Sequence, residues 1–235
     1  MENPKFSIII PARNEEDYIA RTIKSTRNQT YQPLETIVVA NSCNDETARV
    51  ARDLGVNVLE TETPGISHAK NLGTSIAKGD VYVYCDSDSV MRPDLLKTIT
   101  KYLEKGYTSG KARIWSLEPG LKGKLVFSYV DFTARLLANF PFFDSGFGAL
   151  IFSTKSHFDG LVNKYGYGWN ENTKVGEDLD FAYRSKRIGR FAYIKETGIK
   201  TSMRRYDKYG VLKCFWHDAK CFVKPEFSSR DRHQD

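Results

Sequence analysis

The sequence predicts an α/β fold in which helices flank a mostly parallel, Rossmann-like sheet within a single domain. Short β-branched runs alternate with helical stretches from Phe6 to Cys85, which is the pattern of strands joined by crossover helices. Polar residues gather where three of these strands end, and parallel sheets bind ligands at that edge. The 235 residues are 40% hydrophobic and 27% charged, a composition that excludes disordered, collagen-like and coiled-coil proteins.

The first half of the chain contains the regular alternation. The predicted strands are 6–10, 34–40, 56–59 and 80–85, and the predicted helices are 15–27, 45–54 and 67–77. Asn14 is expected to cap the first helix, because an asparagine side chain accepts the free N–H groups of a first turn. The loops 11–15, 41–45 and 86–88 follow strands and are expected to share one edge of the sheet.

The alternation ends after Asp88. The predicted elements that follow are a helix over 93–105, a strand over 111–117, an aromatic-rich helix over 121–139, a strand over 145–152, a glycine and aromatic loop over 165–169, a helix over 177–187 and a helical, basic tail from Tyr206. No linker or internal repeat separates the halves. The second half is therefore expected to complete the sheet of the first.

The net charge and the cysteines limit the classes of binding partner and the cellular compartment that the sequence allows. Subtracting 29 acidic from 35 basic residues gives a net charge of +6, which favours anionic partners such as phosphates, nucleic acid or an anionic membrane. No apolar stretch approaches the roughly 20 residues of a membrane span, and no signal peptide is evident, so a cytosolic location is expected. The 4 cysteines form no CxxC pair and are interpreted as reduced thiols without structural zinc.

Two carboxylates follow the apolar run 81–85. Asp86 and Asp88 are separated by one residue, and alternate residues at an extended strand end point the same way. Paired carboxylates suit Mg²⁺ or Mn²⁺, with diphosphate oxygens and water completing the shell. The alternative is a turn whose aspartates cap the next helix.

A second acidic cluster opens the helix predicted to begin at Glu177. One of its carboxylates could act as a general base while a neighbour orients it or raises its pKa by repulsion between like charges. The alternative needs no function, because acidic residues stabilise the positive end of a helix dipole.

Taken together, these segments resemble the family 2 glycosyltransferases of the GT-A fold. The resemblance covers Phe6 to about Arg205 and consists of five motifs in order. They are Ser7–Glu16, Val38–Thr47, Gly65–Gly73 with Ala77–Asp80, Asp86–Ser89 as the DxD motif, and Gly176–Phe181 as the ED motif. Five ordered motifs at suitable spacing are far more specific than any one of them.

The resemblance implies an inverting transfer from a nucleoside diphosphate sugar, assisted by Mn²⁺ or Mg²⁺. Residues 1–117 would form the nucleotide-sugar half and 118–235 the acceptor half. The donor-binding residues that it implies are Pro11, Ala12, Arg13, Glu15, Asn41, Asp45, Lys70, Asp86 and Ser87, with Asp86 also near the metal, Asp88 as metal ligand, and Arg204 and Arg205 over the diphosphate. The family commonly has aspartate where this chain has Ala40, so base recognition falls to Asn41, Asp45 or the first loop.

The acceptor half is implied to supply the base. Asp178 would remove the proton of the acceptor hydroxyl, and Glu177 and Trp169 would contact a glycan or lipid-linked acceptor. The aromatic residues Phe215, Trp216, Phe222 and Phe227, interleaved with lysines, could seat the enzyme on an anionic membrane, although core packing explains them equally well. His217 is either a further metal ligand or a structural residue.

Three other functions compete with this interpretation. A haloacid dehalogenase-type phosphohydrolase would use Asp86 as nucleophile, but its motif usually follows the first strand and not the fourth. A sugar nucleotidyltransferase would need a glycine-rich loop that 11–14 lacks. A nucleic-acid-binding protein is favoured by charge alone, and no nucleic-acid partner is expected.

Overall fold

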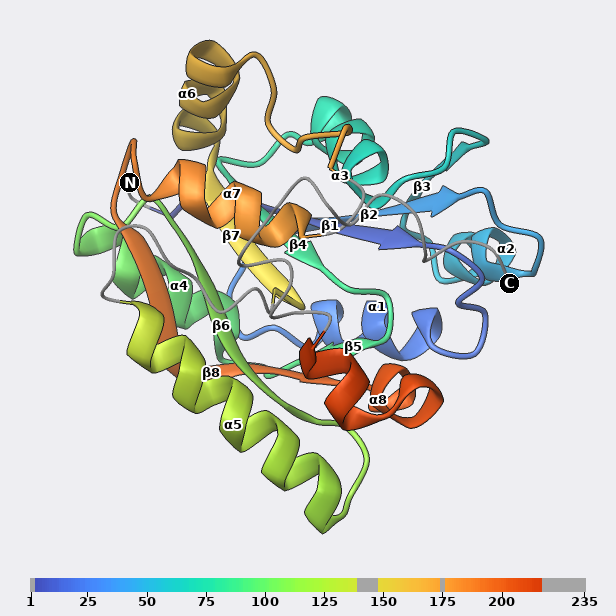
Figure 1. Ribbon diagram of the computed structural model, residues 1–235. Coiled ribbons are helices and arrows are strands. Elements are labelled where there is room, and N and C mark those ends of the chain that lie inside the picture. The colour runs from blue at the N-terminus through green and yellow to red at the C-terminus, as the bar shows by residue number, and fades with distance from the viewer. Residues whose placement is uncertain (1–2, 139–147, 174–175, 217–235) are drawn as a thin grey trace.

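The computed structural model describes residues 3–138, 148–173 and 176–216 (Figure 1). Within these ranges the strands form one eight-stranded sheet in the order β3-β2-β1-β4-β7-β6-β8-β5. The second half of the chain thus completes the sheet of the first, as the sequence predicts.

The first half folds as predicted, with four parallel strands joined by helices. Its elements are β1 (Phe6–Ala12), α1 (Ile19–Arg27), β2 (Leu34–Asn41), α2 (Thr47–Asp53), β3 (Asn57–Thr61), α3 (Ile66–Ile76) and β4 (Val81–Cys85). The expected cap is wrong, because Asn14 has a φ of 54° and Tyr18 occupies the N-cap of α1. The Asn14 Oδ1 atom instead accepts the Asn44 N–H at 2.8 Å, which ties two loops at the strand ends together.

The second half makes the sheet mixed. Its elements are β5 (Ser89–Met91), α4 (Leu95–Glu104), β6 (Ser109–Ser116), α5 (Leu121–Ala138), β7 (Leu150–Thr154), α6 (Lys155–Tyr165), α7 (Glu177–Ser185), β8 (Phe191–Thr201) and α8 (Arg204–Tyr209). Strand β7 runs antiparallel to both β4 and β6, and β5 runs antiparallel to β8, whereas β6 and β8 are parallel. The strands β3-β2-β1-β4 are all parallel, as expected, and four of the seven neighbouring strand pairs in the described sheet are parallel.

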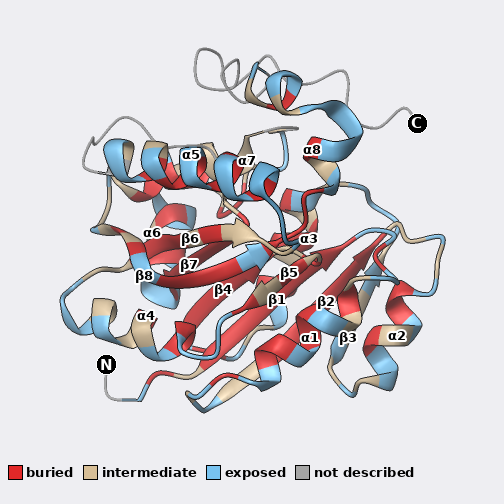
Figure 2. Cartoon of the chain, turned by 90° about the horizontal axis from the view of Figure 1, so that it is seen from below, coloured by how far each residue is buried: buried red, intermediate tan, exposed pale blue. Residues whose placement is uncertain are grey.

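The sheet separates two apolar cores, and Figure 2 shows its buried strands between the covering helices. Successive residues of β1 face opposite sides, as the two-residue period of a strand requires. Ile8 and Ile10 pack with Ile19 and Ile23 of α1, whereas Ile9 packs in the core that contains residues of α3, α6 and α7. Both faces are apolar because helices cover both, which explains the continuous apolar run of β1.

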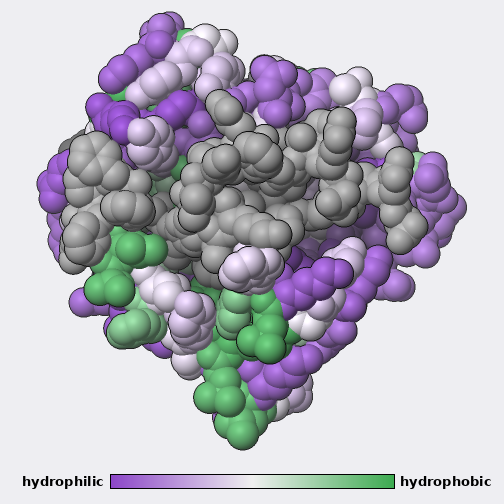
Figure 3. Space-filling model, viewed as in Figure 1, coloured by the Kyte–Doolittle hydropathy of each residue, from purple (hydrophilic) through white to green (hydrophobic). Residues whose placement is uncertain are grey.

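Helix α5 packs on the sheet yet remains apolar on its outer side. Val126 and Val130 are buried, while Leu125 and Phe132 are more than half exposed. In the surface view, hydrophobic patches lie where Figure 1 shows α5 (Figure 3). None of the described helices, α5 included, combines the length and apolar character that crossing a membrane requires.

Candidate active site

The carboxylates that follow β4 lie at the edge of the sheet where β1 and β2 also end. Thr22 of α1 donates its hydroxyl to the Ser87 carbonyl at 2.6 Å, which fixes the turn between Asp86 and Asp88. Burial raises the pKa of Asp86 well above its ordinary value, and the neighbouring carboxylates of Asp88 and Asp178 raise it further, while Lys70 opposes them. Lys70 therefore offsets only part of the effect that burial and the neighbouring carboxylates have on this pKa.

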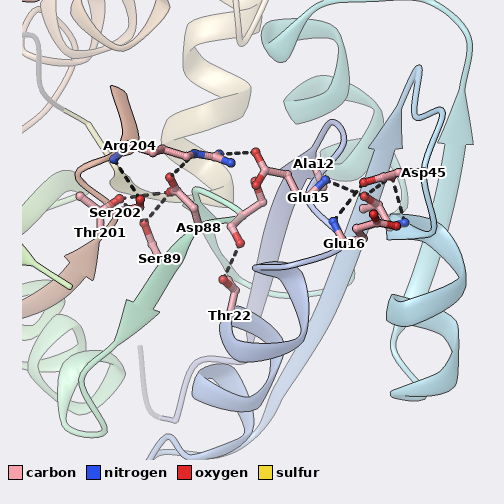
Figure 4. Close-up of polar contacts among 12 residues, drawn as sticks. Ala12, Glu15, Glu16, Thr22, Asp45, Asp88, Ser89, Thr201, Ser202 and Arg204 are labelled. Atoms are coloured by element: carbon pink, nitrogen blue, oxygen red, sulfur yellow. Dashed lines mark hydrogen bonds and ion pairs between the residues drawn. The ribbon is translucent and has the colours of Figure 1, made fainter. Parts of the chain in front are cut away.

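Arg204 connects the second aspartate to the first loop (Figure 4). Its Nε atom lies 3.2 Å from Asp88 Oδ2, and its Nη2 atom pairs with Glu15 Oε1. Thr201 donates its hydroxyl to Asp88 Oδ1 at 3.1 Å. Burial raises the pKa of Glu15 although Arg204 acts to lower it. A cation carried by the chain itself thus bridges a predicted donor-binding residue, Glu15, and a predicted metal ligand, Asp88.

Lys70 of α3 likewise pairs with two carboxylates, which belong to the acidic cluster at the start of α7. Its Nζ atom lies 2.8 Å from Asp178 Oδ1 and 3.4 Å from Glu177 Oε1. The ammonium group also lies 4.0 Å from the centre of the Trp169 ring, a cation–π distance. Although burial opposes the charged form, the carboxylates of Asp178 and Glu177 raise the pKa of Lys70, so this side chain is a buried cation.

Asp178, the second residue of α7, is a largely buried carboxylate. Gly176, with a φ of 82°, turns the chain into this helix in a conformation that favours glycine. Burial and Glu177 raise the pKa of Asp178 to about 6, although Lys70 acts to lower it. A β-carbon at Gly148 would lie 2.4 Å from Asp178 Oδ2, so only glycine leaves room there. Sequence reasoning missed Gly148 because nothing in its local sequence shows that a carboxylate approaches it.

The described site can be compared with known proteins. The family model described as glycosyl transferase family 2 matches residues 7–155, more than half of the chain. The chain belongs to glycosyl transferase family 2. Membership of this family sets aside the phosphohydrolase, nucleotidyltransferase and nucleic-acid-binding alternatives.

One curated relative of this family 2 chain matches it over most of its length. The chain is 25% identical to the chondroitin synthase of Pasteurella multocida (strain Pm70) over 222 residues, 87% of this chain and 22% of that protein. Its matches span 35%, 15% and 22% of the first three curated relatives, so the chain corresponds to about a third or less of those proteins.

Two solved structures show the fold. S. aureus TarS 1-349 in complex with UDP-GlcNAc superposes with a TM-score of 0.65 at 17% identity, covering 84% of this chain and 58% of that chain. Glucosyl-3-phosphoglycerate synthase from Mycobacterium tuberculosis, in complex with Mn²⁺, UDP-glucose and phosphoglyceric acid, has a TM-score of 0.64 at 18% identity and covers 96% and 79%. The fold is therefore of the GT-A type that the sequence resemblance implies.

Two predicted donor residues of this family 2 chain make contacts within the protein. The Asn41 side chain donates to the Thr63 carbonyl at 2.7 Å and accepts the Gly65 N–H at 3.0 Å. Asp45 accepts hydrogen bonds from Thr47 and from the Glu16 N–H, and these bonds lower its pKa although burial acts to raise it. Both side chains therefore shape the loops of the site in this structure.

The expectation for Trp169 requires correction. Its side chain has no exposed surface and stacks on Phe181 with ring centres 4.2 Å apart. It forms the apolar wall behind Lys70 and offers no face to an acceptor. The remaining predicted residues lie near the site on β1, its following loop and α8: Pro11 and Ala12 are buried, Arg13 is exposed and Arg205 is half-buried. His217, Phe222 and Phe227 lie outside the described residues.

A divalent cation fits the donor set of this family 2 site. Among the described residues, no three His, Cys, Asp or Glu side chains converge to hold a metal by themselves. Asp86 and Asp88 supply two carboxylates, so the remaining ligands would have to come from the substrate and water. Burial raises the pKa values of Asp86 and Glu15, neighbouring carboxylates raise them further, and a cation held at Asp86 and Asp88 would act to lower them.

Proposed function

We propose that this protein is an inverting glycosyltransferase that moves a sugar from a nucleoside diphosphate sugar to an acceptor hydroxyl. The observation that carries the proposal is the buried Lys70–Asp178 ion pair at 2.8 Å. This pair joins the helix of the nucleotide-sugar half to the acidic cluster of the acceptor half. It holds a carboxylate beside the residues that follow β4, where a donor would bind.

Asp178 is the proposed general base. A base works best when its pKa lies near the working pH, and burial brings the pKa of Asp178 to about 6. Lys70 fixes Oδ1 and thereby the orientation of the carboxylate. Asp178 then takes the proton of the acceptor hydroxyl as that oxygen attacks the anomeric carbon from the face opposite the diphosphate. Glu177 orients this group or contacts the acceptor.

The donor is proposed to bind along the edge formed by β1 and the turn after β4. Asp86 and Asp88 would hold Mn²⁺ or Mg²⁺, whose chemistry is to neutralise the charge that develops on a departing diphosphate. Pro11, Ala12, Arg13 and Glu15 would contact the nucleoside. Arg204 and Arg205 would bind the diphosphate, which requires the Arg204 guanidinium to leave Glu15 and Asp88.

Each half of the chain has its own proposed role. Residues 1–117 would bind the donor and 118–235 the acceptor, which we propose is a glycan or a lipid-linked sugar. The two solved neighbours contain uridine diphosphate sugars, so these donors are the first to test. The cytosolic location and the reduced state of the cysteines stay predictions.

The direct test is to incubate the protein with Mn²⁺ and a panel of nucleotide sugars and to measure release of the nucleoside diphosphate. We expect release from at least one donor, increased by acceptor. Release of inorganic phosphate from small phosphate esters, with a phosphorylated Asp86 trapped by mass spectrometry, would contradict the proposal.

The metal assignment has its own test in the variant Asp88→Ala. Calorimetry should show that this variant loses the Mn²⁺-dependent part of its affinity for the donor, because a carboxylate and two phosphates repel each other without a cation. Asp159→Ala, which removes an exposed aspartate on α6, is the matched control and should bind like the wild type. Mn²⁺-dependent binding that survives in Asp88→Ala would overturn the assignment.

A further inference from the structure

A stripe of apolar side chains runs along the outer side of α5. The residues are spaced three or four apart, so they share one side of the helix. They are Leu121 (72% exposed), Leu125 (62%), Tyr129 (51%), Phe132 (63%) and Leu136 (55%). The opposite side supplies the buried residues Val126, Phe127, Val130 and Ala134. A helix on the surface of a globular protein normally turns polar residues outward, so this outer stripe needs another explanation.

The stripe continues onto the segment that ends the described chain. Tyr209, Leu212 and Trp216 are 45%, 85% and 67% exposed. The rings of Tyr129 and Phe215 lie 4.8 Å apart, which joins this segment to α5. We call the eight exposed residues, five on α5 and three within 209–216 at and after the end of α8, the α5–α8 surface, and part of its hydrophobic area is visible in Figure 3.

Basic side chains surround this surface. Across residues 121–137 and 205–216, the exposed charged residues are Lys122, Lys124, Arg135, Asp207, Lys208 and Lys213. Only one of these six is acidic, and Lys122 pairs with it at 2.6 Å. The ammonium groups of Lys208 and Lys213 lie 5.2 and 5.9 Å from the centre of the Tyr209 ring. The surface thus combines leucine and aromatic side chains with a positive rim.

We propose that the α5–α8 surface docks onto an anionic lipid bilayer. An interfacial helix inserts its leucine and aromatic side chains into the headgroup region while lysine and arginine side chains bind the anionic headgroups. A second copy of the chain fits less well. A symmetric contact through the same surface would bring the basic rims of the two copies together, and like charges repel.

Docking would place the candidate active site close to the bilayer. Arg204, which contacts Glu15 and Asp88, is the first residue of α8, and Tyr209 is the last. They are five residue steps apart along the helix, a rise of roughly 7.5 Å. The purpose of docking, access to a lipid-linked acceptor, rests on the proposed function. Vesicle binding needs no turnover, so the two proposals can fail separately.

The test is sedimentation with lipid vesicles. We expect the protein to bind vesicles of equimolar phosphatidylcholine and phosphatidylglycerol, to bind pure phosphatidylcholine weakly, and to be released by salt. The triple variant Leu125→Ser, Phe132→Ser and Leu136→Ser should lower the partition coefficient at least about tenfold, because three apolar side chains no longer leave water on docking. The matched control is Ile76→Ser with Val162→Ser, which changes exposed apolar residues on α3 and α6 and should bind like the wild type.

Trp216 provides a second measurement that does not depend on sedimentation. Its fluorescence should shift to the blue when anionic vesicles are added, and the shift should be absent in Trp216→Phe. Circular dichroism should show that the triple variant is folded, since all three side chains are exposed. Absence of wild-type binding, or equal binding by the triple variant, would overturn the proposal. A wild-type dimer that the triple variant converts to a monomer, without vesicle binding, would assign the surface to self-association and also overturn it.

Discussion

Two basic side chains, one from each half of the molecule, form ion pairs with carboxylates of the other half. Lys70, from the nucleotide-sugar half, binds Glu177 and Asp178, whereas Arg204, from the acceptor half, binds Glu15 and Asp88. The Lys70 side chain is 3% exposed and the Arg204 side chain 42%. The contacts are similar in kind, but water reaches only one of the two cations.

This difference in exposure indicates that the Lys70 bridge is fixed and that the Arg204 bridge can move. Removing a cation from a buried pair leaves carboxylates without a partner in a medium of low dielectric, which is costly. An exposed arginine exchanges its partner for water or for another anion at little cost. We therefore assign Lys70 to positioning the base and Arg204 to a contact that yields to an incoming diphosphate.

The largest expected effect is on turnover in Asp178→Asn. A positioned base accelerates proton transfer by around 10²–10⁴-fold, so kcat should fall by about that factor. Donor affinity should change little, because Asp178 acts on the acceptor. The control is Asp180→Asn on the same helix, whose carboxylate pairs with Arg184 at 2.6 Å. Wild-type turnover in Asp178→Asn would place the base elsewhere, and loss of donor binding would indicate a structural role.

The next largest effect is on stability in Lys70→Met. This change keeps the length of the side chain and removes the charge, so it should lower the free energy of unfolding by about 3–5 kcal/mol. Lys97→Met, at an exposed position of α4, should stay within about 0.5 kcal/mol of the wild type in the same denaturant titration. Similar stability of the two variants would show that the Lys70 bridge is dispensable for folding.

The pH dependence of turnover tests whether Asp178, the carboxylate held by Lys70, is the base. The base acts in its deprotonated form, and its raised pKa means that it takes up a proton below about pH 6. We expect kcat to fall about tenfold per pH unit below that point and to level off above it. A profile that stays flat until the ordinary carboxyl value of 3.8 would contradict the assignment of Asp178.

The smallest expected effect is on stability in Arg204→Gln. Because this guanidinium is partly exposed, its loss should cost at most about 1 kcal/mol of unfolding free energy. Affinity for nucleoside diphosphate should nevertheless weaken about tenfold, since a charged hydrogen bond to phosphate is lost. A loss of stability as large as that of Lys70→Met would remove the distinction between the two bridges.

Local sequence predicts the first half better than the second for a physical reason. Strands β1, β2 and β4 are apolar runs buried on both faces and followed by polar loops, a pattern that needs no knowledge of distant residues. Strand β8 was missed because Lys195 and Glu196 interrupt its apolar pattern. The register between β6 and β8 shifts between Ala112 and Arg113. Lys195 and Glu196 therefore lie in this irregularity and have no partner in the regular β6–β8 register.

Local sequence also predicts only part of the candidate site. The motifs at Asp86, Asp88 and Asp178 can be identified because each follows a recognisable strand or begins a helix. Their pairing with cations cannot be identified, since Lys70 is 108 residues from Asp178 and Arg204 is 189 from Glu15. Lys70 was expected at the donor, and only the fold shows that it contacts the acidic cluster.

The stereochemistry of the product tests the central claim most directly. With a donor and acceptor identified by the panel, nuclear magnetic resonance of the early product reports the configuration at its anomeric carbon. A single displacement assisted by Asp178 predicts a configuration opposite to that of the donor. A product that retains the donor configuration would contradict the account, because it would require either a covalent sugar intermediate or attack from the face of the leaving diphosphate.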